Sequence, residues 1–328
     1  MRAPHHLVPD RREITDASTR ISSCMATAPV RYRSPDEDSG RWEGFPFRDG
    51  DIIISARSKS GTTWVQMICA MLIFQTPDLP APLPELSPWL DWLVEPRSEV
   101  LARLSAQRHR RFIKTHTPLD GIPLDPRATY IVVARHPLDM AVSLYHQAAN
   151  IDRDRLRALA GQPGRAPSQP PERRLLIHEW LLEWIDEDAS PREQMDSLPG
   201  VIWHLSDAWA RRHEPNVILV HYEELSAALE AQMRHLAGLL EIDVSQERWP
   251  LLVDAAGFNH MRANASTLAP DRVGVLKDAT AFFRTGATGS GKAELSDHEL
   301  ARYQARVAGM APADLLTWVH DPLRTDSG

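Results

Sequence analysis

The chain has 328 residues, 43% of them hydrophobic and 25% charged, which is ordinary for a water-soluble globular protein. Its net charge of −7 argues against general affinity for nucleic acid. Two cysteines, Cys24 and Cys69, cannot form a disulfide framework and favour a reducing, cytoplasmic compartment, and no run of about 18 apolar residues predicts a membrane span.

The first ordered unit is expected after a polar lead-in, residues 1–40, that we predict to be loosely ordered. Residues 51–54 are typical of a buried strand, a loop follows at 55–60, and residues 61–63 open an apolar helix. Such a loop presents backbone N–H groups to an anion, and the helix dipole adds favourable potential. Lys59 adds a mobile positive charge, so this unit is expected to bind a phosphate or sulfate ester.

This loop differs from the Walker A loop, whose order is G-x-x-x-x-G-K-[ST] with a hydroxyl on Mg²⁺. Here Lys59 precedes Gly61, and the first glycine is missing. The order therefore disfavours a nucleotide kinase, which we keep as an alternative. A strand–turn–helix with an incidental lysine is the structural alternative.

A proline-rich segment, residues 77–88, is followed by two tryptophans, Trp89 and Trp92. It fits a rigid surface loop with the tryptophan pair packed beneath it. It also fits one wall of an apolar acceptor pocket. The sequence leaves both interpretations open.

The segment 112–118 predicts a short strand that carries Lys114 and His116 on one face, because strand side chains alternate with period two. Two titratable groups on an apolar strand are costly to bury unless they have partners or a task. Histidine titrates near neutral pH and can act as a general base on a hydroxyl group. A core histidine with satisfied hydrogen bonds is the structural alternative.

Residues 128–146 repeat the strand–helix pattern, with a strand at 130–133 and Pro137 in the first helical turn. Arg135 at the end of the strand offers a bidentate fork to a second phosphate, and the hydroxyl of Ser143 can donate to the same group. An arginine with only a structural role is the alternative.

Further along, a breaker-rich stretch at 161–171 precedes a helix predicted over 172–188. The helix has an apolar stripe that either packs in the core or forms a mobile cap over a binding site. The members of this stripe and its flank are Ile177, Leu181, Trp184, Leu176 and Trp180.

Strands alternating with helices, including a strand at 216–221 and a helix at 225–240, predict the α/β class. We expect one domain over 41–320, in which a central parallel sheet is flanked by helices on both faces. Residues 151–200 would form a variable helical insertion, and 321–328 a tail. Ligands bind beyond the carboxyl ends of such strands, where both anion-binding segments begin.

These segments resemble the cytosolic-type sulfotransferases and their P-loop-like fold over about residues 40–320. The family signature K-S-G-T-T-W is matched at 59–64, and K-T-H-x-P at 114–118. The resemblance implies 3′-phosphoadenosine 5′-phosphosulfate (PAPS) as sulfuryl donor, PAP as product, His116 as catalytic base, and Lys59 and Lys114 as catalytic cations. It implies donor contacts by Lys59, Ser60, Gly61, Thr62, Thr63 and Trp64, and 3′-phosphate contacts by Arg135 and Ser143.

Later segments extend the resemblance toward the C-terminus. The family's F-F-R-K-G appears as residues 282–286 with Thr285 in place of a cation, and Arg57-Ser58 replace the usual Tyr-Pro. The family's G-D-W-K appears at 289–292 without Asp and Trp. The further donor-binding residues implied are Tyr222, Phe258, Met261, Phe283, Arg284, Thr285 and Gly286.

The segments 87–92, 110–121 and 314–320 resemble the actinobacterial glycolipid sulfotransferases, which implies a hydrophobic or glycolipid acceptor and transient contact with a membrane surface. Phenols and steroid-like alcohols stay open as acceptors, as does a non-catalytic protein that binds adenosine bisphosphate. We expect no metal, because no histidine–carboxylate cluster is apparent. The sequence does not indicate whether the chain forms a homo-oligomer.

Overall fold

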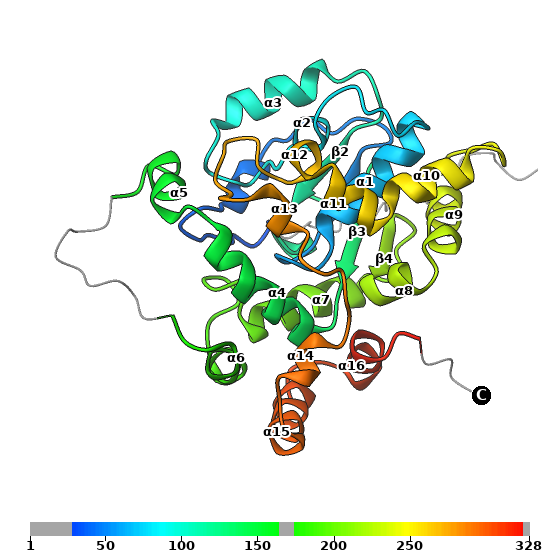
Figure 1. Cartoon of the computed structure of the whole chain (residues 1–328). Helices are drawn as coiled ribbons and strands as arrows, with labels where there is room; N and C mark the ends of the chain where they lie inside the picture. Colours follow the sequence, from blue (N-terminus) through cyan, green and yellow to red (C-terminus); the bar gives the residue numbers. More distant parts are fainter. Residues whose placement is uncertain (1–27, 164–173, 324–328) are drawn as a thin grey trace, which may run out of the picture.

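The computed structural model describes residues 28–163 and 174–323 (Figure 1). Most of the predicted breaker-rich stretch at 161–171 and of the tail at 321–328 therefore lies outside the described residues. None of the described helices is both long and apolar enough to cross a membrane.

A single parallel sheet lies at the centre of the molecule and confirms the predicted α/β class (Figure 1). The strand order is β2-β1-β3-β4, and each strand starts within one residue of its predicted first residue. The strands are β1 Ile52–Ser55, β2 Phe112–Thr115, β3 Thr129–Ala134 and β4 Val217–His221.

Helices follow each strand and cover the sheet. Among the described residues the helical elements are η1 Ser39–Trp42, α1 Thr62–Phe74, α2 Leu83–Leu86, α3 Arg97–Ala106, η2 Leu119–Gly121, α4 Pro137–Asn150, α5 Arg153–Leu159, α6 Ile177–Asp186, α7 Leu198–Ala210, α8 Tyr222–Ala227, α9 Leu229–Leu239, α10 Trp249–Ala256, α11 Phe258–Ala263, α12 Ala265–Leu268, α13 Ala279–Phe282, α14 Ser290–Ala293, α15 Asp297–Ala308 and α16 Ala313–His320.

The two faces of the sheet lie in two separate hydrophobic cores. In β1, Ile52 and Ile54 belong to one core and Ile53 to the other, as the period-two alternation of a strand requires. The first core contains α1, α9 and α10, and the second contains α4, α7 and α15. All three isoleucines are fully buried, so the strand is apolar on both faces.

The sheet has a topological switch point between β1 and β3, and this leaves room for a ligand. These strands are neighbours, yet the helix after β1 (α1) and the helix after β3 (α4) pack in opposite cores. The loops that leave the two strands therefore diverge, which creates a crevice at the carboxyl edge of the sheet.

The N-terminal lead-in predicted over 1–40 is ordered where the structure describes it. Tyr32 is fully buried, and its hydroxyl donates to Asp120 at 2.8 Å. Glu37 forms an isolated β-bridge with Trp92. The polar composition concealed these contacts, because each depends on a partner far along the chain.

Two helix predictions need correction. The helix predicted over 172–188 begins at Ile177 within the described residues, and Leu176, predicted to flank the apolar stripe inside the helix, is its exposed N-cap. The helix predicted over 225–240 is two helices, α8 and α9, which meet at Ala228 in a non-helical conformation. No glycine or proline marks that break in the sequence.

Candidate active site

One cavity of about 520 Å³ opens at the carboxyl edge of the sheet. Every strand delivers a residue to its wall. Lys59 follows β1, His116 follows β2, Arg135 follows β3 and Tyr222 follows β4. The fold therefore brings together four side chains that are far apart in the sequence.

The predicted site residues, with one exception, line this cavity. Ser60 is buried in the loop and does not line the cavity; its backbone N–H donates to the Arg57 carbonyl at 3.2 Å. The others are Lys59, Gly61, Thr62, Thr63, Trp64, Lys114, His116, Arg135, Ser143, Tyr222, Phe258, Met261, Phe283, Arg284, Thr285 and Gly286.

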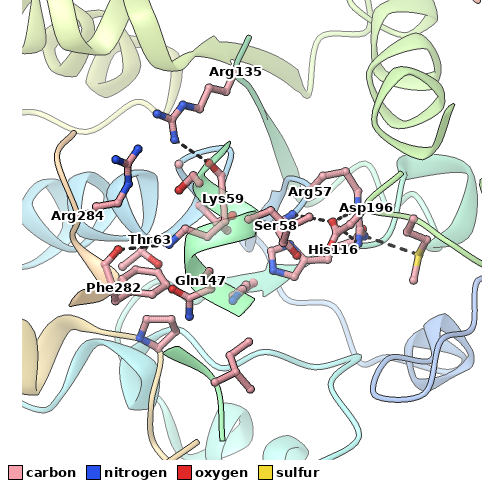
Figure 2. Close-up of a pocket in the computed structure, with 18 of the residues that line it drawn as sticks. Arg57, Ser58, Lys59, Thr63, His116, Arg135, Gln147, Asp196, Phe282 and Arg284 are labelled. Atoms are coloured by element: carbon pink, nitrogen blue, oxygen red, sulfur yellow. Dashed lines mark hydrogen bonds and ion pairs between the residues drawn. The ribbon is translucent and has the colours of Figure 1, made fainter. Parts of the chain in front are cut away.

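Three cationic residues, Lys59, Arg135 and Arg284, lie on one side of the cavity, which we call the donor side (Figure 2). Burial, followed by the charges of Arg135, Lys114 and Arg284, lowers the pKa of Lys59 to about 7. The Nε atoms of Arg135 and Arg284 are buried without a hydrogen-bond partner among the described residues. Cationic side chains that repel one another and have unused N–H donors suit the binding of an anionic ligand such as a bisphosphate.

Main-chain carbonyls and aromatic rings hold Lys59 and Arg135 in place. Lys59 has a positive φ of 65°, and its carbonyl accepts from Arg135 Nη1 at 3.1 Å. The Arg135 guanidinium also lies over the Tyr222 ring, 4.2 Å from its centroid. Lys59 Nζ lies 3.6 Å from the centroid of the Phe282 ring and donates to the carbonyl of that residue at 3.3 Å.

Two glycines on the donor side have no room for a side chain. Gly61, the N-cap of α1, has φ 108°, and a Cβ there would lie 2.9 Å from the Tyr222 ring. Gly286 has φ 66°, and a Cβ there would lie 2.7 Å from the Phe258 ring. Both positions require glycine for conformation and for space, which keeps the two aromatic rings at the cavity wall.

The loop after the F-F-R-T-G segment is fixed by a carboxylate rather than by the missing family motif. Asp139 in the first turn of α4 accepts hydrogen bonds from the backbone N–H groups of Gly289 and Gly291, each at 2.6 Å. The hydroxyl of Ser290 donates to the same carboxylate at 3.2 Å. Gly291 has no space for a Cβ, which would lie 2.3 Å from Leu138.

Figure 2 shows His116 on the side of the cavity away from Arg135 and Arg284. We call the wall formed by His116 and Lys114, which share a contact with Trp89, the acceptor side. The His116 ring packs edge-on against this tryptophan at 4.5 Å, and Lys114 Nζ lies 3.8 Å from its centroid.

The strand predicted over 112–118 ends at Thr115, so His116 lies just beyond β2. Lys114 and His116 still share one face, since the alternate side chains, Thr115 and Thr117, donate instead to Asp91.

The orientation of His116 leaves one ring nitrogen available as a base. Its Nδ1 bonds the carbonyl of Ala56, which can only accept, so Nδ1 carries the proton in the neutral ring. Nε2 is then unprotonated. Burial, together with the charges of Lys114 and Arg57, lowers the pKa of His116 well below its usual value and favours the neutral form.

Sequence reasoning noted Arg57 only as a departure from the family pattern and did not find its role. Its side chain is 3% exposed and donates to Asp196 through Nε at 3.2 Å and Nη2 at 2.9 Å. Its Nη1 donates to the carbonyl of His116 (Figure 2). Arg57 thus joins His116 to the segment before α7, a pairing that sequence spacing could not reveal.

Comparison with known proteins agrees with this geometry. A family model described as "Sulfotransferase domain" matches residues 49–309. A glycolipid sulfotransferase of Mycobacterium bovis (strain BCG) is 42% identical over 311 residues, which cover 90% of this chain and 95% of that protein. The chain belongs to the sulfotransferase family. This sulfotransferase is an enzyme of the PAPS-dependent class.

Other relatives extend the comparison. The glycolipid sulfotransferase Rv1373 of Mycobacterium tuberculosis (strain H37Rv) is 41% identical over 310 residues, covering 90% of this chain and 95% of that protein. A crystal structure of mouse sulfotransferase SULT7A1 complexed with PAP superposes with a TM-score of 0.62. It is 19% identical, covers 86% of this chain and 92% of its own, and therefore shows a shared fold.

The described residues, 28–163 and 174–323, contain no group of three or more histidine, cysteine or acidic side chains arranged to hold a metal ion.

Proposed function

We propose that this sulfotransferase moves the sulfuryl group of PAPS to a hydroxyl group of a glycolipid. The observation that carries the proposal is the single cavity shared by Lys59, Arg135 and His116. A cavity with phosphate-binding cations on one side and an unprotonated imidazole nitrogen on the other suits transfer between an anionic donor and a hydroxyl acceptor.

The donor side would hold both charged ends of PAPS. Lys59 and the N-terminus of α1 would bind the phosphosulfate, and Arg135, Ser143 and Arg284 would bind the 3′-phosphate. Tyr222, Phe258 and Met261 would contact the adenine base, for which the two rings offer aromatic faces. All of these residues line the cavity, which supports these roles.

His116 would act as general base. Its Nε2 would take the proton of the acceptor hydroxyl while that oxygen forms a bond to sulfur. The bond from sulfur to the bridging oxygen would break, and PAP would leave with its electron pair. Lys59 would stabilise the charge that develops on the departing oxygen, and Lys114 would bind the sulfuryl oxygens.

The wall beyond His116 supports a glycolipid acceptor. Trp89 and Trp92 stack at 4.8 Å, and both line the cavity together with Trp180 and Trp184 of α6. The tryptophan pair lines the cavity, which supports the interpretation of this segment as one wall of an acceptor pocket. The glycolipid sulfotransferases named above are the relatives that suggest this acceptor class.

A labelling experiment tests the proposal. The purified enzyme is incubated with PAPS labelled at sulfur and, in parallel, with a mycobacterial glycolipid extract, a sterol and a simple phenol. Label in the glycolipid fraction is expected. Label in the phenol or the sterol alone would reject the acceptor class, and no label in any arm would reject sulfuryl transfer to these hydroxyls.

The same proposal includes a cytoplasmic location, which the buried thiol of Cys69 in α1 supports, since it has no disulfide partner within residues 28–163 and 174–323.

A further inference from the structure

A short N-terminal segment, residues 34–38, contributes to the acceptor side of the cavity; we call it the strap. The strap lies outside the matched family domain, which begins at residue 49. It is held by the backbone N–H of Leu93, which donates to the Asp36 carbonyl at 2.8 Å, and by the bridge between Glu37 and Trp92. Ser34, Asp36 and Glu37 line the cavity.

Glu37 is a buried acid with unused hydrogen-bonding capacity. Its side chain is 9% exposed, and Oε2 has no hydrogen-bond donor among the described residues. The nearest cation is Arg57 Nη1 at 3.6 Å, but that guanidinium already donates to Asp196 and to the His116 carbonyl. A buried polar group without a partner is costly, unless a ligand supplies the partner.

The position of Glu37 relates it to the reacting hydroxyl. Arg57 lies between the Glu37 carboxyl group and the main-chain carbonyl of His116, and the side chains of both Glu37 and His116 line the cavity. The stacked pair Trp89 and Trp92 forms the adjoining wall, with an interplanar angle of 11°. An aromatic wall next to a carboxyl group suits a ring that has apolar C–H faces and several hydroxyl groups at its edge.

We infer that Glu37 binds a second hydroxyl group of the acceptor while His116 acts on the first. The enzyme would then select acceptors with several hydroxyl groups, such as a sugar headgroup, over a phenol, a sterol or a simple alcohol. A single hydroxyl group engages only His116 and leaves Glu37 without a partner. This inference rests on the proposed function and assigns its specificity to the strap.

Burial raises the pKa of Glu37 to about 8, with Arg57 acting in the opposite direction. At neutral pH the carboxyl group therefore carries a proton in much of the enzyme and can both donate to and accept from a hydroxyl group. This capacity also suits a polyhydroxylated acceptor.

Two acceptors with the same alkyl tail test the inference: octyl glucoside, which carries a sugar, and octanol, which carries one hydroxyl group. We expect Glu37→Leu to lower the ratio of kcat/KM for octyl glucoside to that for octanol by about 10-fold or more, mainly through KM. Glu37→Gln keeps a hydrogen-bonding side chain and is expected to retain more of the ratio. The control is Glu43→Leu, at an exposed residue outside the cavity.

Calorimetric titration with PAP verifies that each variant is folded and binds nucleotide. An equal loss on both acceptors, an unchanged ratio, or no advantage of Glu37→Gln over Glu37→Leu would overturn the specificity role. Wild-type enzyme that sulfates octanol but not octyl glucoside would also overturn it. Wild-type enzyme that binds PAP but sulfates neither acceptor nor a glycolipid would instead contradict the proposed function.

Discussion

The two sides of the cavity differ in how their charged side chains are paired. On the donor side Lys59, Arg135 and Arg284 repel one another, and the two arginines retain unused buried donor atoms. On the acceptor side Arg57 is paired with Asp196 and lies near Glu37. The cations of the donor side thus depend on an anionic ligand, whereas Arg57 on the acceptor side is already paired within the protein.

The sequence predicted the residues of the donor side more completely than those of the acceptor side. Donor-side residues belong to compact segments such as 59–64, in which neighbours along the chain act together. On the acceptor side, Lys114 and His116 also belong to one compact segment and were found, but the role of Arg57 was not, because it pairs with a carboxylate 139 positions later. A motif reveals residues that are neighbours along the chain and not a partner at that distance.

The largest expected effect tests the assignment of the base. His116→Ala should lower kcat by about 10²–10⁴-fold, because the acceptor hydroxyl loses its proton acceptor. Binding of PAP, measured by calorimetry, should be nearly unchanged, since His116 belongs to the acceptor side. The control His213→Ala changes an exposed histidine outside the cavity. Turnover at the wild-type rate in His116→Ala would refute the base assignment.

The next effect concerns Lys59. Lys59→Met should lower kcat by about 10²–10³-fold, because charge on the leaving oxygen would lose its cation. Lys277→Met is the matched control, since Lys277 is exposed and does not line the cavity. Steady-state kinetics with saturating PAPS checks the prediction. A change in KM alone would assign Lys59 to ground-state binding instead.

A smaller effect distinguishes the two sides by binding alone. Arg135→Met should weaken PAP about 10–100-fold, because a charge-assisted hydrogen bond contributes about 1.5–3 kcal/mol. Calorimetric titration measures the change, with Arg302→Met as a control at an exposed position outside the cavity. Unaltered PAP affinity would remove Arg135 from the 3′-phosphate site.

The pH dependence of activity should differ between the free enzyme, measured by kcat/KM, and the enzyme with bound substrate, measured by kcat. Lys59, with its pKa lowered to about 7, and Lys114, with its pKa lowered to about 8, lose charge as the pH rises. The value of kcat/KM for PAPS should therefore fall above about pH 7–8, by up to tenfold per unit. Bound anions favour charged lysines, so the alkaline limb of kcat should lie at higher pH.

The decline of activity at acidic pH reports the protonation of His116, the proposed base. Because the pKa of His116 is lowered well below its usual value, the neutral form persists at acidic pH, and activity should not yet have declined at about pH 6.5, the ordinary histidine pKa. Profiles of both kinetic constants over the same buffers would show this. An alkaline limb at the same pH in kcat and kcat/KM would argue against Lys59 and Lys114 as its source.

The smallest effect concerns the missing family cation at position 285. Thr285 is exposed and lines the cavity, so Thr285→Lys should tighten PAP by about 1.5–5-fold, the range of an exposed ion pair. Thr288→Lys adds the same charge nearby but outside the cavity lining and should change affinity less. Equal tightening in both variants would indicate a general charge effect rather than a specific contact.

Much of the fold followed from local pattern. Hydrophobic runs such as 130–133 predicted the strands, and Pro137 marked the start of α4, where it lies in the first turn. The break between α8 and α9 at Ala228 was missed, because packing rather than a glycine or proline determines it. The order of the strap was missed because its partners, such as Trp92, are remote in sequence.

The central claim is that the donor and acceptor sides belong to one cavity, because Lys59, Arg135 and His116 all line it. A crystal structure of the enzyme with PAP and octyl glucoside tests this most directly. We predict the PAP phosphates against Lys59, Arg135 and Arg284, with a sugar hydroxyl in hydrogen-bond reach of His116 Nε2. PAP or the sugar in a different cavity would contradict the account.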